Sequence, residues 1–138
     1  MTMQGGGLTS QFGWEGDGGL GDYLIERILR GEKTATCCPL ALYSDEEIAR
    51  IRGSQGRSVT VLDERGTPRC RILVLDVYEV PFGQPGDRLL RGEGFDNDLT
   101  GFQEAHRNVW NDLLREASIE LTPETVLLVE QFHLIVEP

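Results

Sequence analysis

Residues 68–80 read PRCRILVLDVYEV and carry the clearest structural signal in the chain, a long run rich in β-forming side chains. Apolar residues occur at both even and odd positions of this run, so we predict that both faces of the strand are covered. These residues are Ile72, Leu73, Val74, Leu75 and Val77. The preceding run RSVTVLD, residues 57–63, is also β-rich, and a tight turn over residues 64–67 would join the two as a hairpin.

Two further segments of the chain have β signals. TVLLVEQFHLIVE, residues 125–137, predicts a second long strand, and KTATCC, residues 33–38, predicts a short strand or an extended loop. Short helical segments stand among these long β segments without regular βαβ alternation. The pattern predicts an α+β domain built around a curled sheet.

Three segments have helical signals. The first runs from about residue 20 to 30, and Gly31 is placed to end it. The second opens at Ser44, whose spacing from Glu47 matches a capping box, and the third begins near residue 99 with Thr100 as its candidate cap. The apolar stripes of the first and third helices are Leu20, Tyr23, Leu24 and Ile28, and Phe102, His106, Val109, Trp110 and Leu113.

The length of 138 residues allows one domain with one modest core. We predict a single domain over residues 12–138. Residues 1–11 are Gly-rich and polar, so we expect them to form a flexible N-terminal tail.

The charge of the chain narrows the class of ligand. Thirteen Lys and Arg against 23 Asp and Glu give a formal net charge of −10. Such a surface repels the phosphate backbone and offers little of the counterion release that drives sequence-independent nucleic-acid binding. A small uncharged ligand fits this charge better, although a local basic strip would still permit RNA.

We expect a cytoplasmic protein without membrane association. No apolar stretch approaches the roughly 20 residues that span a bilayer, and MTMQGGGLTS lacks the basic and apolar segments of a secretion signal. Three cysteines, two of them adjacent, do not make a disulfide framework and fit a reducing compartment.

The sequence does not support several common types of binding or catalytic site. Glycines at 16, 18 and 21 match a dinucleotide pattern, but no strand precedes them and Asp17 would repel a pyrophosphate. His106 and His133 are the only histidines, and the cysteines lack paired ligand spacing, so we predict no cofactor and no structural zinc. A carboxylate-bound Mg²⁺ or Mn²⁺ leaves no firm signature and stays open. No GxSxG nucleophile elbow occurs.

Cys37 and Cys38 raise the question of a thiol nucleophile, since either could form a Cys–His pair with His106. However, cysteine is among the most buried residue types, and His106 lies on the apolar stripe of its helix. A place in the core or in a pocket wall is therefore favoured for His106.

Lys33 is the only lysine of the chain, against twelve arginines. A desolvated lysine can lose its proton near neutrality and act as a base, which a guanidinium does not do. Lys33 and Thr36 have opposite parity along an extended strand, so a bend after Gly31 is needed to bring them together. On composition alone, a solvated lysine beside an edge strand is the simpler interpretation.

Glu93, in RGEG at residues 91–94, is similarly ambiguous. Flanking glycines let a backbone approach a ligand closely, and a buried carboxylate could act as a general acid or base. An ordinary solvated loop glutamate is the alternative. Four aromatic residues could offer a stacking surface for a base, although most aromatics of a small domain are core. They are Phe12, Trp14, Phe95 and Phe102.

Taken together, these segments resemble the ASCH domain family over about residues 12–136. The combination of a G-x-K-T-x-T element with the later E-G…L…H spacing is specific, whereas either one alone is not. The matching residues are GEKTAT at 31–36, Asp63, Gly66, Pro68, Cys70, VPF at 80–82, Glu93-Gly94, Asp98-Leu99, Phe102, His106, Trp110 and VLLVEQF at 126–132.

The resemblance implies a PUA-like fold, a small mixed β-barrel with flanking helices and a cleft associated with RNA or nucleoside recognition. Some characterised relatives are amidohydrolases that remove the acyl group from N4-acylcytidine, and another is described as a ribonuclease. In the amidohydrolases a Lys-x-x-Thr pair and a glutamate form the proposed catalytic set. By resemblance, this set falls on Lys33, Thr36 and Glu93.

Five further residues are expected to contact the substrate, namely Thr34, Phe12, Trp14, Phe102 and His106. The chain departs from the family pattern in two places. The entry motif is altered by Trp14 after Phe12 and Gly13, and Phe102 stands where the late helix usually carries tryptophan. These departures concern the shape of the pocket and therefore the substrate.

The leading hypothesis is an amidohydrolase acting on an N-acylated nucleoside such as N4-acetylcytidine. The alternatives are a non-catalytic module that binds single-stranded RNA and a metal-dependent ribonuclease. A basic strip beside the cleft would support RNA, whereas an acidic rim would support a small neutral substrate. The arginines available for such a strip include Arg50, Arg52, Arg57, Arg69 and Arg71.

Overall fold

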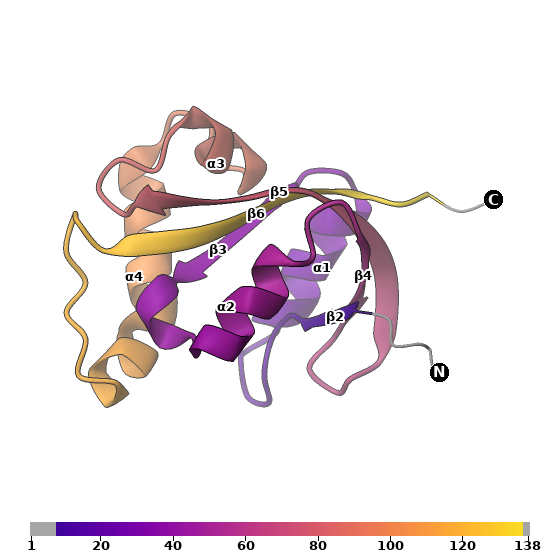
Figure 1. The fold of residues 1–138 in the computed structure, drawn as a ribbon, viewed down its shortest axis with the longest axis horizontal. Helices are drawn as coiled ribbons and strands as arrows, with labels where there is room; N and C mark the ends of the chain where they lie inside the picture. Colours follow the sequence, from indigo (N-terminus) through magenta and orange to yellow (C-terminus); the bar gives the residue numbers. More distant parts are fainter. Residues whose placement is uncertain (1–7, 137–138) are drawn as a thin grey trace.

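The structure, a computed structural model that describes residues 8–136, has a curled five-stranded sheet at its centre (Figure 1). The strands are β2 (Leu8–Gln11), β3 (Ala35–Pro39), β4 (Ser58–Leu62), β5 (Pro68–Pro81) and β6 (Val126–Leu134). They lie in the order β2-β4-β5-β6-β3. β2 runs parallel to β4 and the other neighbours are antiparallel, so the sheet is mixed. The predicted α+β fold around a curled sheet is confirmed.

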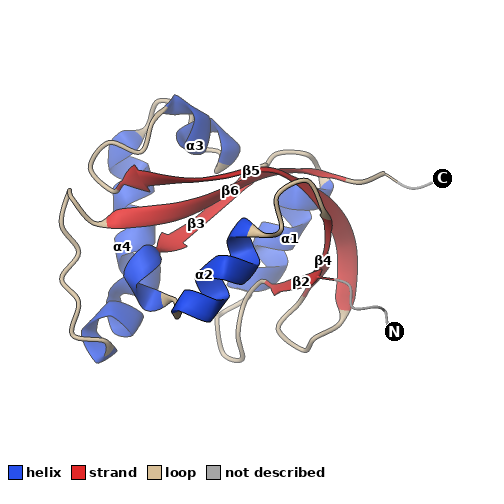
Figure 2. Ribbon diagram, viewed as in Figure 1, coloured by secondary structure: helices blue, strands red, loops and turns tan. Residues whose placement is uncertain are grey.

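Helices lie around this sheet (Figure 2). They are α1 (Leu20–Leu29), α2 (Asp45–Arg52), α3 (Asp87–Gly92) and α4 (Leu99–Glu116), with a 3-10 turn η1 (Leu40–Leu42) before α2. The Ser44–Glu47 capping box is present as predicted. Asp98 caps α4 by accepting from the Gly101 backbone N–H, so the predicted Thr100 cap is wrong. The six-residue α3 was not predicted, because it is too short to show a periodic apolar pattern.

Part of the predicted N-terminal tail is a strand of the sheet, so the prediction is wrong for these residues. Residues 8–11 form β2, which pairs with residues 59–62 of β4, and Leu8 packs against the core cluster around Val59. The remainder of the predicted tail, residues 1–7, lies outside the described residues.

The long strand β5 is covered less completely than predicted. Ile72 and Val74 are buried, but 49% of Leu75 is exposed. The register with β6 shifts between Val74 and Asp76, and such a bulge turns one extra side chain out of the alternation. The prediction that both faces are covered is therefore wrong at Leu75.

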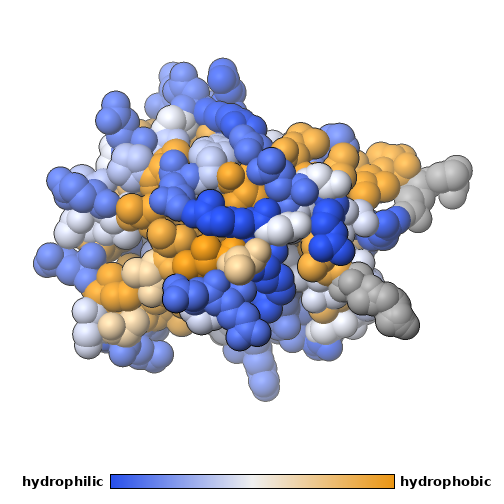
Figure 3. Space-filling view, in the orientation of Figure 1, coloured by the Kyte–Doolittle hydropathy of each residue, from blue (hydrophilic) through white to orange (hydrophobic). Residues whose placement is uncertain are grey.

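Two apolar clusters fill the interior and fix the helices on the sheet. One contains Phe82, Phe102, Trp110 and Val129 and anchors α4. The other contains Ile25 and Ile28 of α1 and packs against β4 and β5. Apolar side chains also gather in the middle of the face drawn in Figure 3, surrounded by hydrophilic ones.

Among the described residues, no helix is both long and apolar enough to cross a membrane.

Candidate functional site

Lys33 lies in the short link between α1 and β3 and points inward. Gly31 has φ of 77°, and the Lys33 backbone N–H donates to the Arg27 carbonyl oxygen at 3.1 Å, which wraps the chain around the helix end. The Lys33 ammonium donates to the carbonyl oxygen of Ala35 at 2.6 Å and to Oε1 of Glu93 at 2.7 Å. Only 2% of Lys33 is exposed. The predicted bend after Gly31 is present.

Glu93 caps the C-terminal end of α3 and is 6% exposed. Gly92 lets α3 approach β3, because a Cβ at this position would lie 2.5 Å from the Ala35 Cβ. Gly94 has φ of 85°, and a Cβ there would overlap the Arg27 guanidinium, which donates to the Glu93 carbonyl oxygen at 3.3 Å. The two glycines flanking Glu93 therefore allow the close packing that brings its carboxylate to Lys33.

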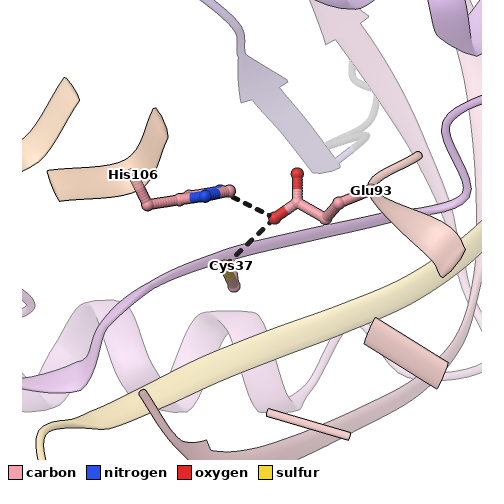
Figure 4. Close-up of side chains that lie close together, drawn as sticks. All are labelled: Cys37, Glu93 and His106. Carbon is pink, nitrogen blue, oxygen red and sulfur yellow. Dashed lines mark hydrogen bonds and ion pairs between the residues drawn. The ribbon is translucent and has the colours of Figure 1, made fainter. Parts of the chain in front are cut away.

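The second carboxylate oxygen of Glu93 faces two other groups (Figure 4). The Cys37 Sγ from β3 and the His106 Nε2 from α4 each lie 3.1 Å from Oε2. The His106 ring is packed between aromatic neighbours, with centroid distances of 4.2 Å to Phe102 and 4.9 Å to Trp110. Side chains from β3 and α4 thus meet at the carboxylate that follows α3.

Electrostatics keep Glu93 ionised. Burial alone would raise the pKa of Glu93, but the Lys33 ammonium and the His106 hydrogen bond lower it to about 2. Burial and the adjacent Glu93 charge raise the pKa of Cys37 well above its usual value. Cys37 is therefore a thiol that donates to Glu93, and it is not poised as a thiolate nucleophile.

A cavity of about 490 Å³ opens beside this cluster. Its polar wall is formed by Arg27, Lys33, Thr36, Cys37, Glu93 and His106. The rest of its wall is largely apolar and includes Leu20, Tyr23, Leu24, Phe95, Val109 and Trp110. A mostly apolar cavity of this size with a few convergent polar groups is typical of small-molecule sites.

The predicted catalytic residues come together, since Lys33, Thr36 and Glu93 all line this cavity. Of the predicted substrate contacts, His106 lines it as well, and Trp14 is 48% exposed in an adjoining hollow of about 260 Å³. Thr36, Cys37, Val109 and Trp110 belong to the walls of both hollows.

Three predicted substrate contacts do not line the 490 Å³ cavity. Phe102 is completely buried and supports the His106 ring from behind, so it offers no stacking surface. Thr34 is absent from the described cavity wall, and its backbone N–H donates to the Gly92 carbonyl oxygen at 2.8 Å, which holds α3 to the start of β3. Phe12 is 7% exposed in the core, although it reaches the adjoining hollow.

Cys37 is the member of the cluster that the sequence did not assign to the site. Its partner Glu93 is 56 residues away, and no spacing rule connects them. The sequence pointed to Cys37 only as one of two cysteines that could pair with His106.

Comparisons with known proteins agree with the fold. The ASCH domain family model matches residues 9–136. The crystal structure of an ASCH domain from Lactobacillus crispatus JV V101 superposes with a TM-score of 0.74 at 27% identity, covering 92% of this chain and 79% of that one. A DUF984 protein from Enterococcus faecalis V583 gives a TM-score of 0.72 at 20% identity, covering 93% and 76%. No curated protein matches.

The family match spans nearly the whole described chain, and the curled mixed sheet agrees with these structures. The chain therefore belongs to the ASCH domain family, with a PUA-like fold.

Proposed function

We propose that the protein is an amidohydrolase that cleaves the acyl group from an N-acylated nucleoside such as N4-acetylcytidine. The observation that supports this most is the buried Lys33–Glu93 pair, 2.7 Å apart on the wall of a cavity that also contains Thr36. An amine, a carboxyl group and a hydroxyl are the groups that amide cleavage through an acyl intermediate requires.

The resting pair is ionic, whereas the reaction needs a neutral amine and a protonated carboxyl group. One proton shift along the Lys33–Glu93 hydrogen bond produces both. A neutral substrate that fills the cavity displaces water, and a low-dielectric surrounding favours the neutral pair over the separated charges. Substrate binding would thus create the base and the acid in a single step.

The neutral Lys33 amine then takes the proton of the Thr36 hydroxyl as its oxygen attacks the acyl carbon. Glu93 gives its proton to the leaving exocyclic amine as the C–N bond breaks. A water molecule, deprotonated by Glu93, cleaves the Thr36 ester and releases the carboxylic acid, and the proton on Lys33 returns to Thr36. Proton transfers of this kind contribute roughly 10²- to 10⁴-fold each to a rate.

The charges around the cavity favour a small neutral substrate over an RNA strand. Within the described chain, the cavity wall includes Arg27 and none of the five arginines considered for a basic strip. Arg69 is engaged with Asp22, Glu26 and Asp63. The net charge of −10 acts in the same direction.

The proposal is tested by incubating the protein with N4-acetylcytidine and measuring cytidine by liquid chromatography. Thr36→Val removes the attacking hydroxyl at nearly constant volume, and Thr34→Val is the matched control because Thr34 lies outside the cavity wall. We expect cytidine from the wild type and Thr34→Val, with a loss of at least about 100-fold in Thr36→Val. Release at the blank rate by the folded wild type would refute the amidohydrolase activity on this substrate.

A further inference from the structure

The Cys37 Sγ, a Glu93 carboxylate oxygen and the His106 Nε2 lie within 4.8 Å of one another. We propose that these three groups bind a zinc ion whose fourth position opens into the 490 Å³ cavity. This goes beyond the proposed function, in which no step uses a metal.

The ligand types are those that zinc prefers. Thiolate, imidazole and carboxylate bind Zn²⁺ at about 2.3, 2.0 and 2.1 Å, and three protein ligands with one open position are the usual form of a reactive zinc site. A thiolate also disfavours Mg²⁺ and Mn²⁺, which prefer oxygen ligands.

The present spacing is close to what such a site needs. The Cys37 Sγ and the His106 Nε2 each lie 3.1 Å from the Glu93 Oε2. Tetrahedral bonds of the lengths above separate two ligand atoms by roughly 3.3–3.6 Å. The two contacts of Oε2 therefore need to lengthen by only a few tenths of an ångström, and Sγ and Nε2, which lie within 4.8 Å of each other, need to approach by at most about 1.2 Å.

The hydrogen-bond partners of His106 and Glu93 are those expected around metal ligands. The His106 Nδ1 lies 2.8 Å from the Phe102 carbonyl oxygen. Because a carbonyl can only accept, Nδ1 carries a hydrogen and keeps it, so Nε2, which donates to Glu93 in the metal-free protein, is the nitrogen that can exchange its hydrogen for a metal. A ligating histidine commonly donates its other N–H to a backbone carbonyl in this way. Lys33 occupies Oε1 of Glu93, which leaves Oε2 for the ion.

Metal binding would replace the Cys37 thiol proton and the His106 Nε2 proton, as Zn²⁺ plus S–H and Nε2–H gives a Zn–S bond, a Zn–N bond and two released H⁺. Because two protons leave as one Zn²⁺ enters, the net charge of the cluster does not change. The Lys33 ammonium repels the zinc ion, but it bonds to the other carboxylate oxygen.

The test uses the full chain, treated with chelator and then dialysed, with no substrate present. Cobalt(II) replaces zinc as a spectroscopic probe, since a sulfur–cobalt bond adds a near-ultraviolet charge-transfer band. We expect a 1:1 titration with this band, displacement of cobalt by zinc, and release of about two protons per ion.

Cys37→Ser should lose the band and bind zinc more than about 100-fold more weakly. Cys38→Ser is the matched control, because the Cys38 thiol is not a member of the cluster, and it should titrate like the wild type. Circular dichroism of each variant without metal confirms that it is folded.

Absence of 1:1 binding in the folded wild type would overturn the zinc site, as would a band that survives Cys37→Ser or disappears in Cys38→Ser. These readouts involve no hydrolysis. An inactive protein that binds zinc through Cys37 would refute only the proposed amidohydrolase, and an active one that binds none would refute only the metal site.

Discussion

Glu93 and Glu130 both lie against β3, one in each of the two adjoining hollows. Glu93 contacts Cys37, and Glu130 is the cross-strand partner of Thr36. Burial acts on both, yet the pKa of Glu93 is lowered to about 2 whereas burial raises the pKa of Glu130 to about 6. The difference comes from Lys33 and His106, which supply positive charge and hydrogen bonds to Glu93.

The comparison teaches that burial alone does not define the role of a carboxylate. By pKa alone Glu130 is the better general acid near neutral pH, since its value lies closer to the working pH. Glu93 instead has the geometry, with Lys33 and the wall of the larger cavity beside it. The assignment of Glu93 to the reaction therefore depends on a proton delivered by Lys33.

Replacing each carboxylate by its amide should separate the two roles most strongly. We expect Glu93→Gln to lower the rate of N4-acetylcytidine cleavage by about 10²- to 10⁴-fold, because the amide can neither take the Lys33 proton nor pass it on. Glu130→Gln should change the rate less than about threefold. Initial rates at pH 7 under equal substrate measure both, and the reverse pattern would move the acid–base role to Glu130.

Removing the charge beside Glu93 should cost more stability than any other single change in the cavity. Lys33→Met leaves a buried carboxylate without its cation, and breaking such a pair from one side costs about 3–5 kcal/mol of unfolding free energy. Urea denaturation at pH 7 measures this cost. The double variant Lys33→Met/Glu93→Gln should recover part of it, and a strictly additive loss would mean that the pair contributes no coupling.

The lowered pKa of Glu93 should make the stability of the protein depend on pH in the acidic range. The folded state holds Glu93 ionised more strongly than the unfolded chain, whose reference value is 4.5. Its contribution, roughly 3 kcal/mol, is therefore complete above about pH 4.5 and is lost as pH falls toward about 2. The difference in unfolding free energy between wild type and Glu93→Gln should shrink over this range, and a constant difference would contradict the shift.

Sequence patterns identified the parts of this molecule that local rules control. The run around 68–80, the run around 125–137 and the Ser44 capping box depend on neighbouring residues. The first run and the capping box are present as predicted, and β6 covers Val126–Leu134 of the second run. Lys33 and Glu93 were found through family resemblance, because the contact between them spans 60 residues. β2 was missed because four residues of mixed polarity become a strand only by pairing with β4.

The apolar stripes of two helices show a further limit of sequence patterns. Tyr23 of α1 and Val109 of α4 recur at core spacing, but they are 58% and 36% exposed and line the cavity. Periodicity shows that a helix has an apolar face, and it does not distinguish a face packed on the core from one that borders a ligand site. Cys37 was missed for a related reason, since its role depends on partners that only the fold brings near.

The smallest expected effect concerns Glu130 and has the opposite sign from that of Glu93. Its raised pKa means that the folded state favours the protonated form, so ionisation costs stability as pH rises from about 4.5 through about 6. Glu130→Gln removes this cost and should stabilise the protein by up to roughly 2 kcal/mol at pH 8, with no gain at pH 4. Urea denaturation at the two pH values measures both. An equal gain at pH 4 and pH 8 would assign the effect to packing or hydrogen bonding of the amide. Glu130 would then not be a buried carboxylate whose charge lacks a compensating partner, and the contrast with Glu93 would fail.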